Sequence, residues 1–437
     1  MSAASARCAT AAAASGPFNF VANFLSYFVF GILLNSVGTV ILLVQKSFPD
    51  ITKSQVAVLE PFKDFSIAIV SFLVTSFITK IGYKKAMLIA LAFVVLVCFS
   101  VPFSNSFLVI ELLFAAVGSS FALIKMSVYG SIGLVTNDEK EHITFMNFIE
   151  SVFGLGIVLS YFLFPLFIDK NNPGSASWRN VYFLLGGISL VAFLLLLTSP
   201  LNESAAKFPK QANFSDDLRK TYQLVATPAV VVFIICAFLY VLLEQSIMSW
   251  LPTFNNNVLK LNEVLSIRMA SILAGSMAVG RFLAGVGFKK LNWALLLSIC
   301  LIAAAGIVLV CMPVIHQFIA TYKGNGITVL ADVPLIAFAF PLIGLVIAPI
   351  YPALNSVILS SLPKPAHGLM AGLIIVFSAV GGTTGSLITG NIFQYYGGQN
   401  AMYFSLVPIA LLFIGLIVFS RLQKKALAKA VNSATSS

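Results

Sequence analysis

Charged residues are scarce in this sequence: 9% of its 437 residues are Asp, Glu, Lys or Arg, whereas a soluble globular domain has roughly 25%. Hydrophobic residues make up 59%, which is more than a water-soluble fold of this length can bury. We therefore infer that lipid is the solvent for most of the chain. We expect a multi-pass protein of the plasma membrane, or of the inner membrane in a Gram-negative bacterium.

Cysteine and histidine are also rare, with five and three copies. The cysteines show no CxxC spacing and lie mostly in apolar runs, so we predict neither a disulfide framework nor a metal site. The sequence has no nucleophile–base constellation, phosphate loop or HExxH motif, which argues against an enzyme and against a cofactor. The net charge of +11 comes from basic residues spread between apolar runs, so we predict no nucleic-acid partner.

Apolar segments long enough to cross a bilayer, about 20 residues each, follow one another along the chain. They lie near residues 18–45, 55–79, 84–103, 106–135, 142–168, 179–199, 226–253, 264–288, 292–315, 333–361, 367–393 and 399–421. The only long polar stretch, Leu201 to Thr227, separates the first six from the last six. We therefore expect an all-α membrane protein with a disordered tail (1–16), a six-helix bundle (17–200), a cytoplasmic linker (201–225), a second bundle (226–422) and a tail (423–437).

The two halves share a short basic segment after corresponding helices. Gly82-Tyr83-Lys84-Lys85 follows the second apolar segment, and Gly287-Phe288-Lys289-Lys290 follows the eighth. Parallel halves of this kind are typical of transporters that rock one bundle against the other. With both termini inside, the inner loops and tails hold sixteen basic residues and the outer loops six. The positive-inside rule therefore predicts cytoplasmic termini.

These features resemble the major facilitator superfamily. The segment Thr75 to Lys85 (TSFITKIGYKK) is similar to that superfamily's loop motif, and Gly280-Arg281-Phe282 and Trp178-Arg179 agree with it. The resemblance covers almost the whole chain and implies two pseudo-symmetric six-helix bundles around a central cavity. It also implies alternating access for a small-molecule substrate, and we expect a monomer in the lipid bilayer.

Within the superfamily, the sequence is most similar to the fucose–galactose–glucose proton symporters. Ser54 to Lys84 aligns with that family's second helix without a gap, Glu244-Gln245-Ser246 with Trp250-Leu251-Pro252 resembles its seventh, and Tyr351-Pro352 its tenth. The chain departs from the family's polar pattern at Gly38, Lys125 and Glu150. A sugar and a charged organic solute therefore both remain open as substrates.

Charged residues inside the predicted spans are the main functional candidates, because a charge at mid-bilayer costs at least ~2.5–3.5 kcal/mol and tends to face a cavity and a partner. Lys125 and Glu150 lie roughly mid-span in neighbouring segments, and we predict that they form an ion pair with Glu150 as the proton-coupling carboxylate. Glu60 and Asp64, which share a helical face with Lys63, are the next coupling candidates. For both groups, a purely structural ion pair is the alternative.

The remaining candidates are polar or aromatic residues near the expected cavity. For substrate binding they are Lys125, Asn147, Asn35, Glu244, Gln245, Trp250 and Tyr351, and for gating Lys84, Lys85 and Arg281. Tyr27, Tyr129 and Tyr240 are further aromatic candidates for the cavity lining.

Glycines and prolines predict where helices approach closely or break. Gly154 and Gly156, and Gly381 and Gly385, are expected at a rocking interface, and Pro349 and Pro352 are expected to break the tenth segment. Together these features predict a secondary active transporter that takes up a small polar solute with protons. The alternative is a proton-driven exporter of a drug or a metabolite such as a siderophore.

Overall fold

A computed structural model describes residues 17–135, 139–169, 171–172, 174–199, 227–287, 292–324, 326–362 and 367–435. The chain divides into two compact units, Met1–Gln211 and Ala212–Ser437. The expected linker (201–225) and N-terminal tail (1–16) lie outside the described residues. In the expected C-terminal tail (423–437), the last helix continues to Thr435.

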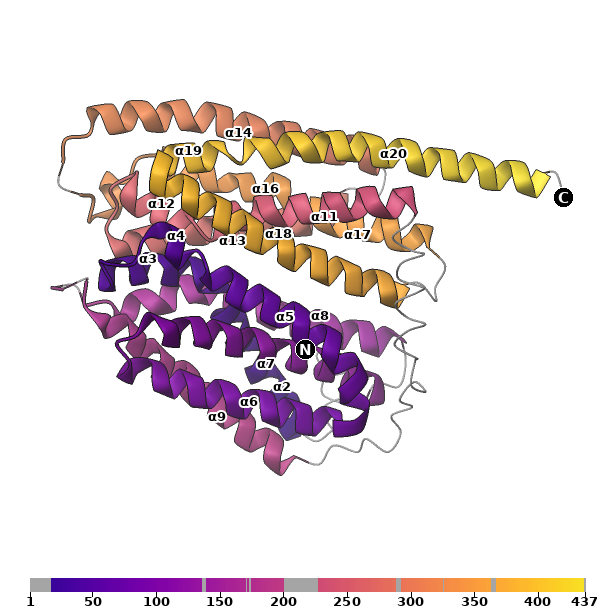
Figure 1. The fold of residues 1–437 in the computed structure, drawn as a ribbon, viewed down its shortest axis with the longest axis horizontal. Helices are drawn as coiled ribbons and strands as arrows, with labels where there is room; N and C mark the ends of the chain where they lie inside the picture. Colours follow the sequence, from indigo (N-terminus) through magenta and orange to yellow (C-terminus); the bar gives the residue numbers. More distant parts are fainter. Residues whose placement is uncertain are drawn as a thin grey trace. The chain divides into compact units, whose positions relative to one another are not determined.

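Unit 1 is built from long helices that run side by side (Figure 1). Its elements are α2 (Pro17–Asn35), α3 (Val37–Ser47), α4 (Lys53–Val56), α5 (Leu59–Ile81), α6 (Tyr83–Ser100), η1 (Val101–Phe103), α7 (Phe107–Val135), α8 (Glu139–Leu163), η2 (Phe164–Phe167), η3 (Ala176–Asn180) and α9 (Val181–Thr198). Helix α2 packs on α7, α8 and α9, while α7 also packs on α5 and α6. Helix α6 in turn packs on α9.

Unit 2 repeats this plan with more interruptions. Its elements are α11 (Pro228–Met248), α12 (Leu251–Asn257), α13 (Glu263–Gly287), α14 (Trp293–Thr321), η5 (Leu330–Asp332), α15 (Ile336–Ala339), η6 (Phe340–Leu342), α16 (Ile343–Ile347), α17 (Ile350–Ser361), α18 (His367–Tyr396), α19 (Gly398–Tyr403) and α20 (Leu406–Thr435). Helix α11 packs on α18 and α20, α13 packs on α16, and α14 packs on α16 and α20. In each unit, therefore, the first span packs on the fifth and sixth, the second on the fourth, and the third on the fourth and sixth.

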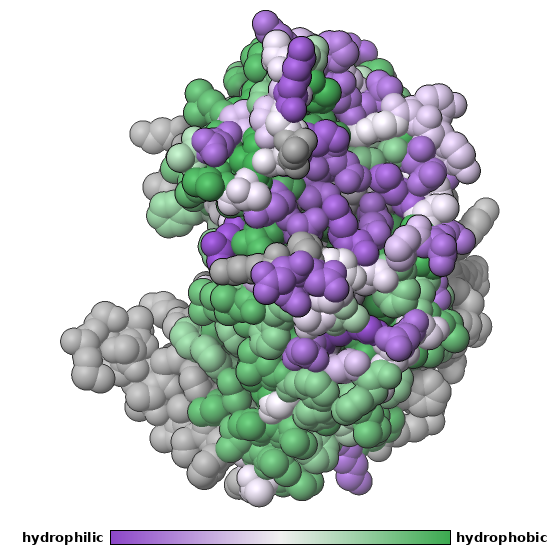
Figure 2. Space-filling view, turned by 90° about the vertical axis from the view of Figure 1, so that its left-hand side faces the viewer, coloured by the Kyte–Doolittle hydropathy of each residue, from purple (hydrophilic) through white to green (hydrophobic). Residues whose placement is uncertain are grey.

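Ten helices in the described part of the chain are long and apolar enough to cross a membrane, and α2 with α3, bent by 51°, supplies an eleventh. The remaining predicted segment corresponds to α5, whose 23 residues are also long enough for a bilayer. Many large apolar side chains on these helices are exposed, as expected where lipid replaces water. Figure 2 shows a face of the molecule on which hydrophilic residues gather, with hydrophobic residues beside them.

Glycines mark the closest helix crossings, and these crossings lie inside each unit. A Cβ on Gly156 of α8 would stand 2.5 Å from the carbonyl oxygen of Phe28 and 3.1 Å from the Cα of Gly31, both on α2. In unit 2, a Cβ on Gly381 or Gly385 of α18 would collide with carbonyl oxygens of α11. The close contacts of Gly156, Gly381 and Gly385 therefore hold each unit together, and this differs from their expected place at a rocking interface.

Helix breaks follow the predicted prolines in part. The tenth span is interrupted at Ala348 and Pro349, between α16 and α17, because proline has no N–H to continue the helical hydrogen bonds. The first span bends at Ser36, and the seventh is interrupted at Ser249 and Trp250. Ser36 donates its hydroxyl hydrogen to the carbonyl of Leu33 at 2.8 Å, which satisfies one acceptor at the bend.

Candidate functional site

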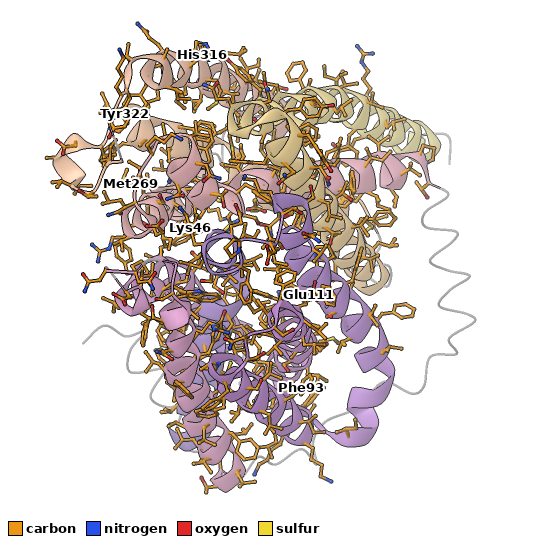
Figure 3. The ribbon with its side chains drawn as sticks, turned by 60° about the vertical axis from the view of Figure 1, so that its left-hand side comes forward. Lys46, Phe93, Glu111, Met269, His316 and Tyr322 are labelled. Carbon is orange, nitrogen blue, oxygen red and sulfur yellow. The ribbon has the colours of Figure 1, made fainter. Side chains whose placement is uncertain are left out.

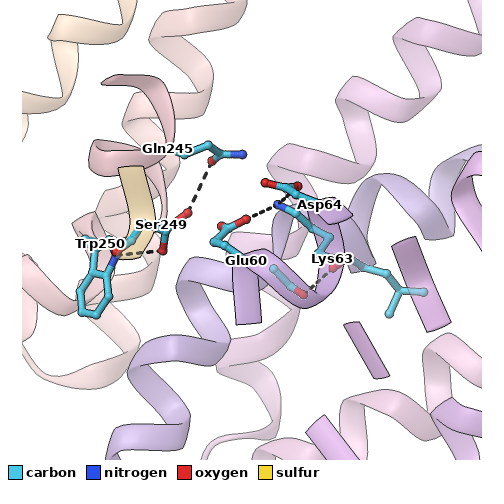
Figure 4. Close-up of polar contacts among 9 residues, drawn as sticks. Glu60, Lys63, Asp64, Gln245, Ser249 and Trp250 are labelled. Atoms are coloured by element: carbon cyan, nitrogen blue, oxygen red, sulfur yellow. Dashed lines mark hydrogen bonds and ion pairs between the residues drawn. The ribbon is translucent and has the colours of Figure 1, made fainter. Parts of the chain in front are cut away.

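The first charged group lies in the first two turns of α5. The Lys63 ammonium is 2.5 Å from a Glu60 carboxylate oxygen and 3.5 Å from an Asp64 carboxylate oxygen (Figure 4). Their residues are 5%, 1% and 8% exposed. The i, i+3 spacing of Glu60 and Lys63 and the adjacency of Asp64 bring all three together, as the sequence predicts. Two carboxylates and one ammonium give the group a surplus of negative charge when all three are ionised.

The second group lies where α2, α7 and α8 meet. Tyr129 of α7 donates its phenol hydrogen to an Oε1 atom of Glu150 on α8. The Lys125 ammonium lies 5.7 Å from the centre of the Phe121 ring and 5.6 Å from that of Tyr129. The described side chains form no ion pair between Lys125 and Glu150. The predicted direct pair is therefore wrong for this structure, because the phenol of Tyr129 meets the carboxylate and two aromatic faces meet the ammonium.

Tyr27 of α2 completes this group. Its ring stacks on that of Tyr129, with centroids 6.5 Å apart and planes at 22°. Phe121 and Phe153 contact its edges. The Tyr27 hydroxyl lies near that of Tyr129 but completes no hydrogen bond with the described residues.

The third group lies in unit 2, at the meeting of α11, α13 and α17. Arg281 of α13 forms an ion pair with Glu244 of α11 at 3.3 Å. Tyr240, one turn before Glu244, donates its phenol hydrogen to the same carboxylate oxygen at 3.3 Å. Tyr351 of α17 stacks on Tyr240 with centroids 5.3 Å apart and planes at 21°, and its hydroxyl is 2.9 Å from that of Ser378.

The two units thus carry the same small arrangement. A tyrosine of the first span stacks on a tyrosine of the fourth, and one phenol of the pair donates to a glutamate. The i, i+4 spacing of Tyr240 and Glu244 was a signal that the sequence offered. The contact of Tyr129 with Glu150 joins two helices, so no spacing in the sequence indicates it. The contact of Ser378 with Tyr351 also joins two helices and has no such signal in the sequence.

Other predicted substrate-binding residues have structural partners. Asn35 donates to the carbonyl of Gly31 at 2.9 Å, and Gln245 accepts from Ser249 at 3.4 Å. Trp250 (labelled in Figure 4) is 0% exposed, stacks on Phe393, and donates its indole hydrogen to Ser386. These contacts are those of a packing residue within unit 2, and its role in substrate binding stays a prediction. The side chain of Asn147 lies outside the described residues.

The predicted gating residues separate into different roles. Lys84 donates to the carbonyl oxygens of Leu197 at 3.1 Å and Ser199 at 2.6 Å, and so caps the end of α9. Lys85 is exposed, and Arg281 belongs to the third group. Lys289 and Lys290 lie outside the described residues. Within the described part of the chain, no three His, Cys, Asp or Glu side chains are grouped as metal ligands.

Two helical units with the same packing order, made of apolar spans that enclose charged groups, define a multi-pass membrane transport protein. The model of the Major Facilitator Superfamily matches residues 19–331, which is more than half of the chain. The chain therefore belongs to the Major Facilitator Superfamily. Membership of this superfamily identifies a transporter and not an enzyme.

Solved structures of transporters share the fold. A bacterial homolog of the human lysosomal transporter Spinster, inward-facing and occupied, matches with a TM-score of 0.71 and 14% identity over 93% of this chain and 97% of that one. The nucleoside transporter NupG matches with 0.66 and 16% over 93% and 98%. The peptide transporter POT matches with 0.66 and 12% over 92% and 95%. At such identities the likeness concerns the fold alone.

One curated relative shows similarity in sequence. The TsgA homolog of Buchnera aphidicola subsp. Baizongia pistaciae is 24% identical over 271 residues, which is 61% of this chain. The match spans 62% of the length of that relative.

Proposed function

We propose that this transporter takes up a small polar solute together with protons by alternating access, with Glu150 as the coupling carboxylate. The observation that carries the proposal is the hydrogen bond from Tyr129 to Glu150 beside the Lys125 ammonium. An ionised carboxylate accepts such a hydrogen bond strongly, and a protonated one weakly. Proton binding at Glu150 therefore changes how α7 and α8 are joined.

The resemblance to fucose–galactose–glucose proton symporters supports uptake in the plasma membrane, and it leaves a sugar and a charged organic solute as substrate classes. Glu60 and Asp64 form a second carboxylate group in unit 1 and are the next coupling candidates. In unit 2, Glu244 and Tyr351 are the proposed solute-binding residues, with Arg281 holding Glu244. Exchange of the Arg281 contact for a solute contact would let substrate binding loosen the joint between α11 and α13.

Proton coupling is tested in proteoliposomes that contain a pH-sensitive dye. Addition of a transported member from a panel of monosaccharides and organic acids should acidify the interior. Glu150→Gln should abolish this acidification and pH-driven accumulation while sparing solute exchange, because exchange needs no net proton movement.

The matched control is Glu111→Gln, since Glu111 (labelled in Figure 3) is a glutamate of the neighbouring helix α7 that lies outside the charged groups. Liposomes with Glu111→Gln should acidify their interior at the wild-type rate when the solute is added. Acidification by Glu150→Gln at the wild-type rate would contradict the role of Glu150 and direct attention to Glu60 and Asp64. A wild type that accumulates solute without proton entry would contradict proton coupling altogether.

A further inference from the structure

Cationic side chains within the described spans differ in what their charged groups face. Four of them have a polar acceptor. Lys63 faces Glu60 and Asp64, Arg281 faces Glu244, Lys84 faces main-chain carbonyl oxygens, and Arg179 donates to the amide oxygen of Asn105 at 2.9 Å. Each of these four charges therefore has a partner within its own unit.

Lys125 differs from these four residues. Its half-buried ammonium lies over the rings of Phe121 and Tyr129, and no acceptor among the described residues bonds to it. Aromatic faces attract a cation through their quadrupoles. They offer no lone pair in the manner of an oxygen, however, and an ammonium has three N–H donors. The donors of Lys125 are thus available for an anionic oxygen that the described residues do not provide.

The neighbouring groups also suit an anion. The nearby carboxylate of Glu150 already accepts from Tyr129, and the buried Tyr27 hydroxyl beside it completes no hydrogen bond with the described residues. The Tyr27 hydroxyl is thus a second polar group beside Glu150. We propose that Lys125 binds the anionic group of the transported solute, so that the solute is a small organic anion. This inference rests on the proposed transport function and names its substrate class.

Anion binding at Lys125 and proton binding at Glu150 favour each other. An ionised Glu150 repels an anion at Lys125, and a proton removes that repulsion; by linkage, the anion favours the proton equally. The other titratable groups that face Glu150 in the described residues are Tyr27 on α2 and Tyr129 on α7, besides Lys125 itself. One proton and one monovalent anion add no net charge to the site. Coupling therefore follows without a direct bond between Lys125 and Glu150.

The test measures ligand binding and requires no gradient, so it is independent of the transport assay. Purified full-length protein in a neutral detergent is heated with a panel of carboxylates, phosphates and sulfonates. Each anion is compared with a neutral analogue of the same skeleton, such as glucuronate with glucose and lactate with lactamide. At concentrations on the order of 100 times Kd, a binding anion should raise Tm by roughly 5–10 °C, and more at acidic than at alkaline pH.

Three variants locate the effect. Lys125→Met should lose the anion-specific shift, Lys125→Arg should keep it, and Lys323→Met, which removes an exposed loop cation, should behave as the wild type. If Lys125→Met does not fold, the comparison of each anion with its neutral analogue on the wild type and on Lys125→Arg still shows whether the protein binds anions in preference to neutral solutes.

Four outcomes would overturn the inference. In the first, no anion of the panel stabilises the wild type more than its neutral analogue does. In the second and third, the anion-specific rise in Tm survives in Lys125→Met, or is larger at alkaline pH than at acidic pH. In the fourth, phosphatidylglycerol stabilises the protein and the soluble anions do not. The last would make Lys125 a lipid site. Because Glu150→Gln acidification is measured separately, anion binding can fail while proton-coupled uptake of a neutral solute stands.

Discussion

Gly154 and Gly156 lie two residues apart on α8 and allow the same substitution to be made in opposite environments. A Cβ at Gly156 would lie 2.5 Å from the carbonyl oxygen of Phe28, whereas a Cβ at Gly154 would have no described atom within 4 Å. Replacement of glycine by alanine inside a helix gains about 0.8–1 kcal/mol from propensity at either position. Only at Gly156 must α2 and α8 also move apart.

The magnitude follows from the difference between the two variants, because the propensity gain cancels. Overpacking of a tight contact costs about 1–3 kcal/mol, and each kcal/mol shifts Tm by about 2–4 °C in a protein part of 150–250 residues. Gly156→Ala should therefore melt roughly 2–12 °C below Gly154→Ala, and Gly154→Ala should melt at or above the wild type. Thermal unfolding in detergent, followed by intrinsic fluorescence, measures this. Equal melting temperatures for the two variants would refute the reasoning that Gly156 sets the distance between α2 and α8.

Two further predictions concern the α5 charges and the orientation of the chain. Lys63→Met should lower the free energy of unfolding by about 3–5 kcal/mol, since it leaves two buried carboxylates without their ammonium. A triple variant that adds Glu60→Gln and Asp64→Asn should recover most of the lost Tm. A triple variant no more stable than Lys63→Met would contradict this. Lys85→Cys, at an exposed position, should react with an impermeant thiol reagent from the cytoplasmic side only, in a background whose native cysteines are replaced. Labelling from the outside would invert the predicted topology.

The helical architecture was predictable because hydrophobic length alone identifies a span. The sequence places α2 and α11 at the start of the first and the second set of six apolar segments, and each begins its own unit in the structure. What hydropathy does not contain is the interruption of a span. The bend at Ser36 and the division of the tenth span into α15, η6, α16 and α17 depend on local hydrogen bonds and packing, and only Pro349 signalled one of them.

The charged groups show where sequence reasoning reaches its limit. Contacts within one helix, such as Glu60 with Lys63, follow from spacing and were predicted. Contacts between helices depend on the rotation of each helix about its axis, which opposite charges alone do not determine. Lys125 and Glu150 lie on neighbouring helices, yet the rotation of α7 directs Tyr129 to the carboxylate and the ammonium to aromatic rings.

The cap that Lys84 forms on α9 has a mechanical consequence. The ammonium at the start of α6 holds the carbonyl oxygen of Ser199, where the described part of unit 1 ends. A pull on the chain beyond Ser199 would load α6 through Lys84 as well as α9 through its backbone. The force would therefore spread over two packed helices, and the last turn of α9 would resist unwinding better than a free helix end.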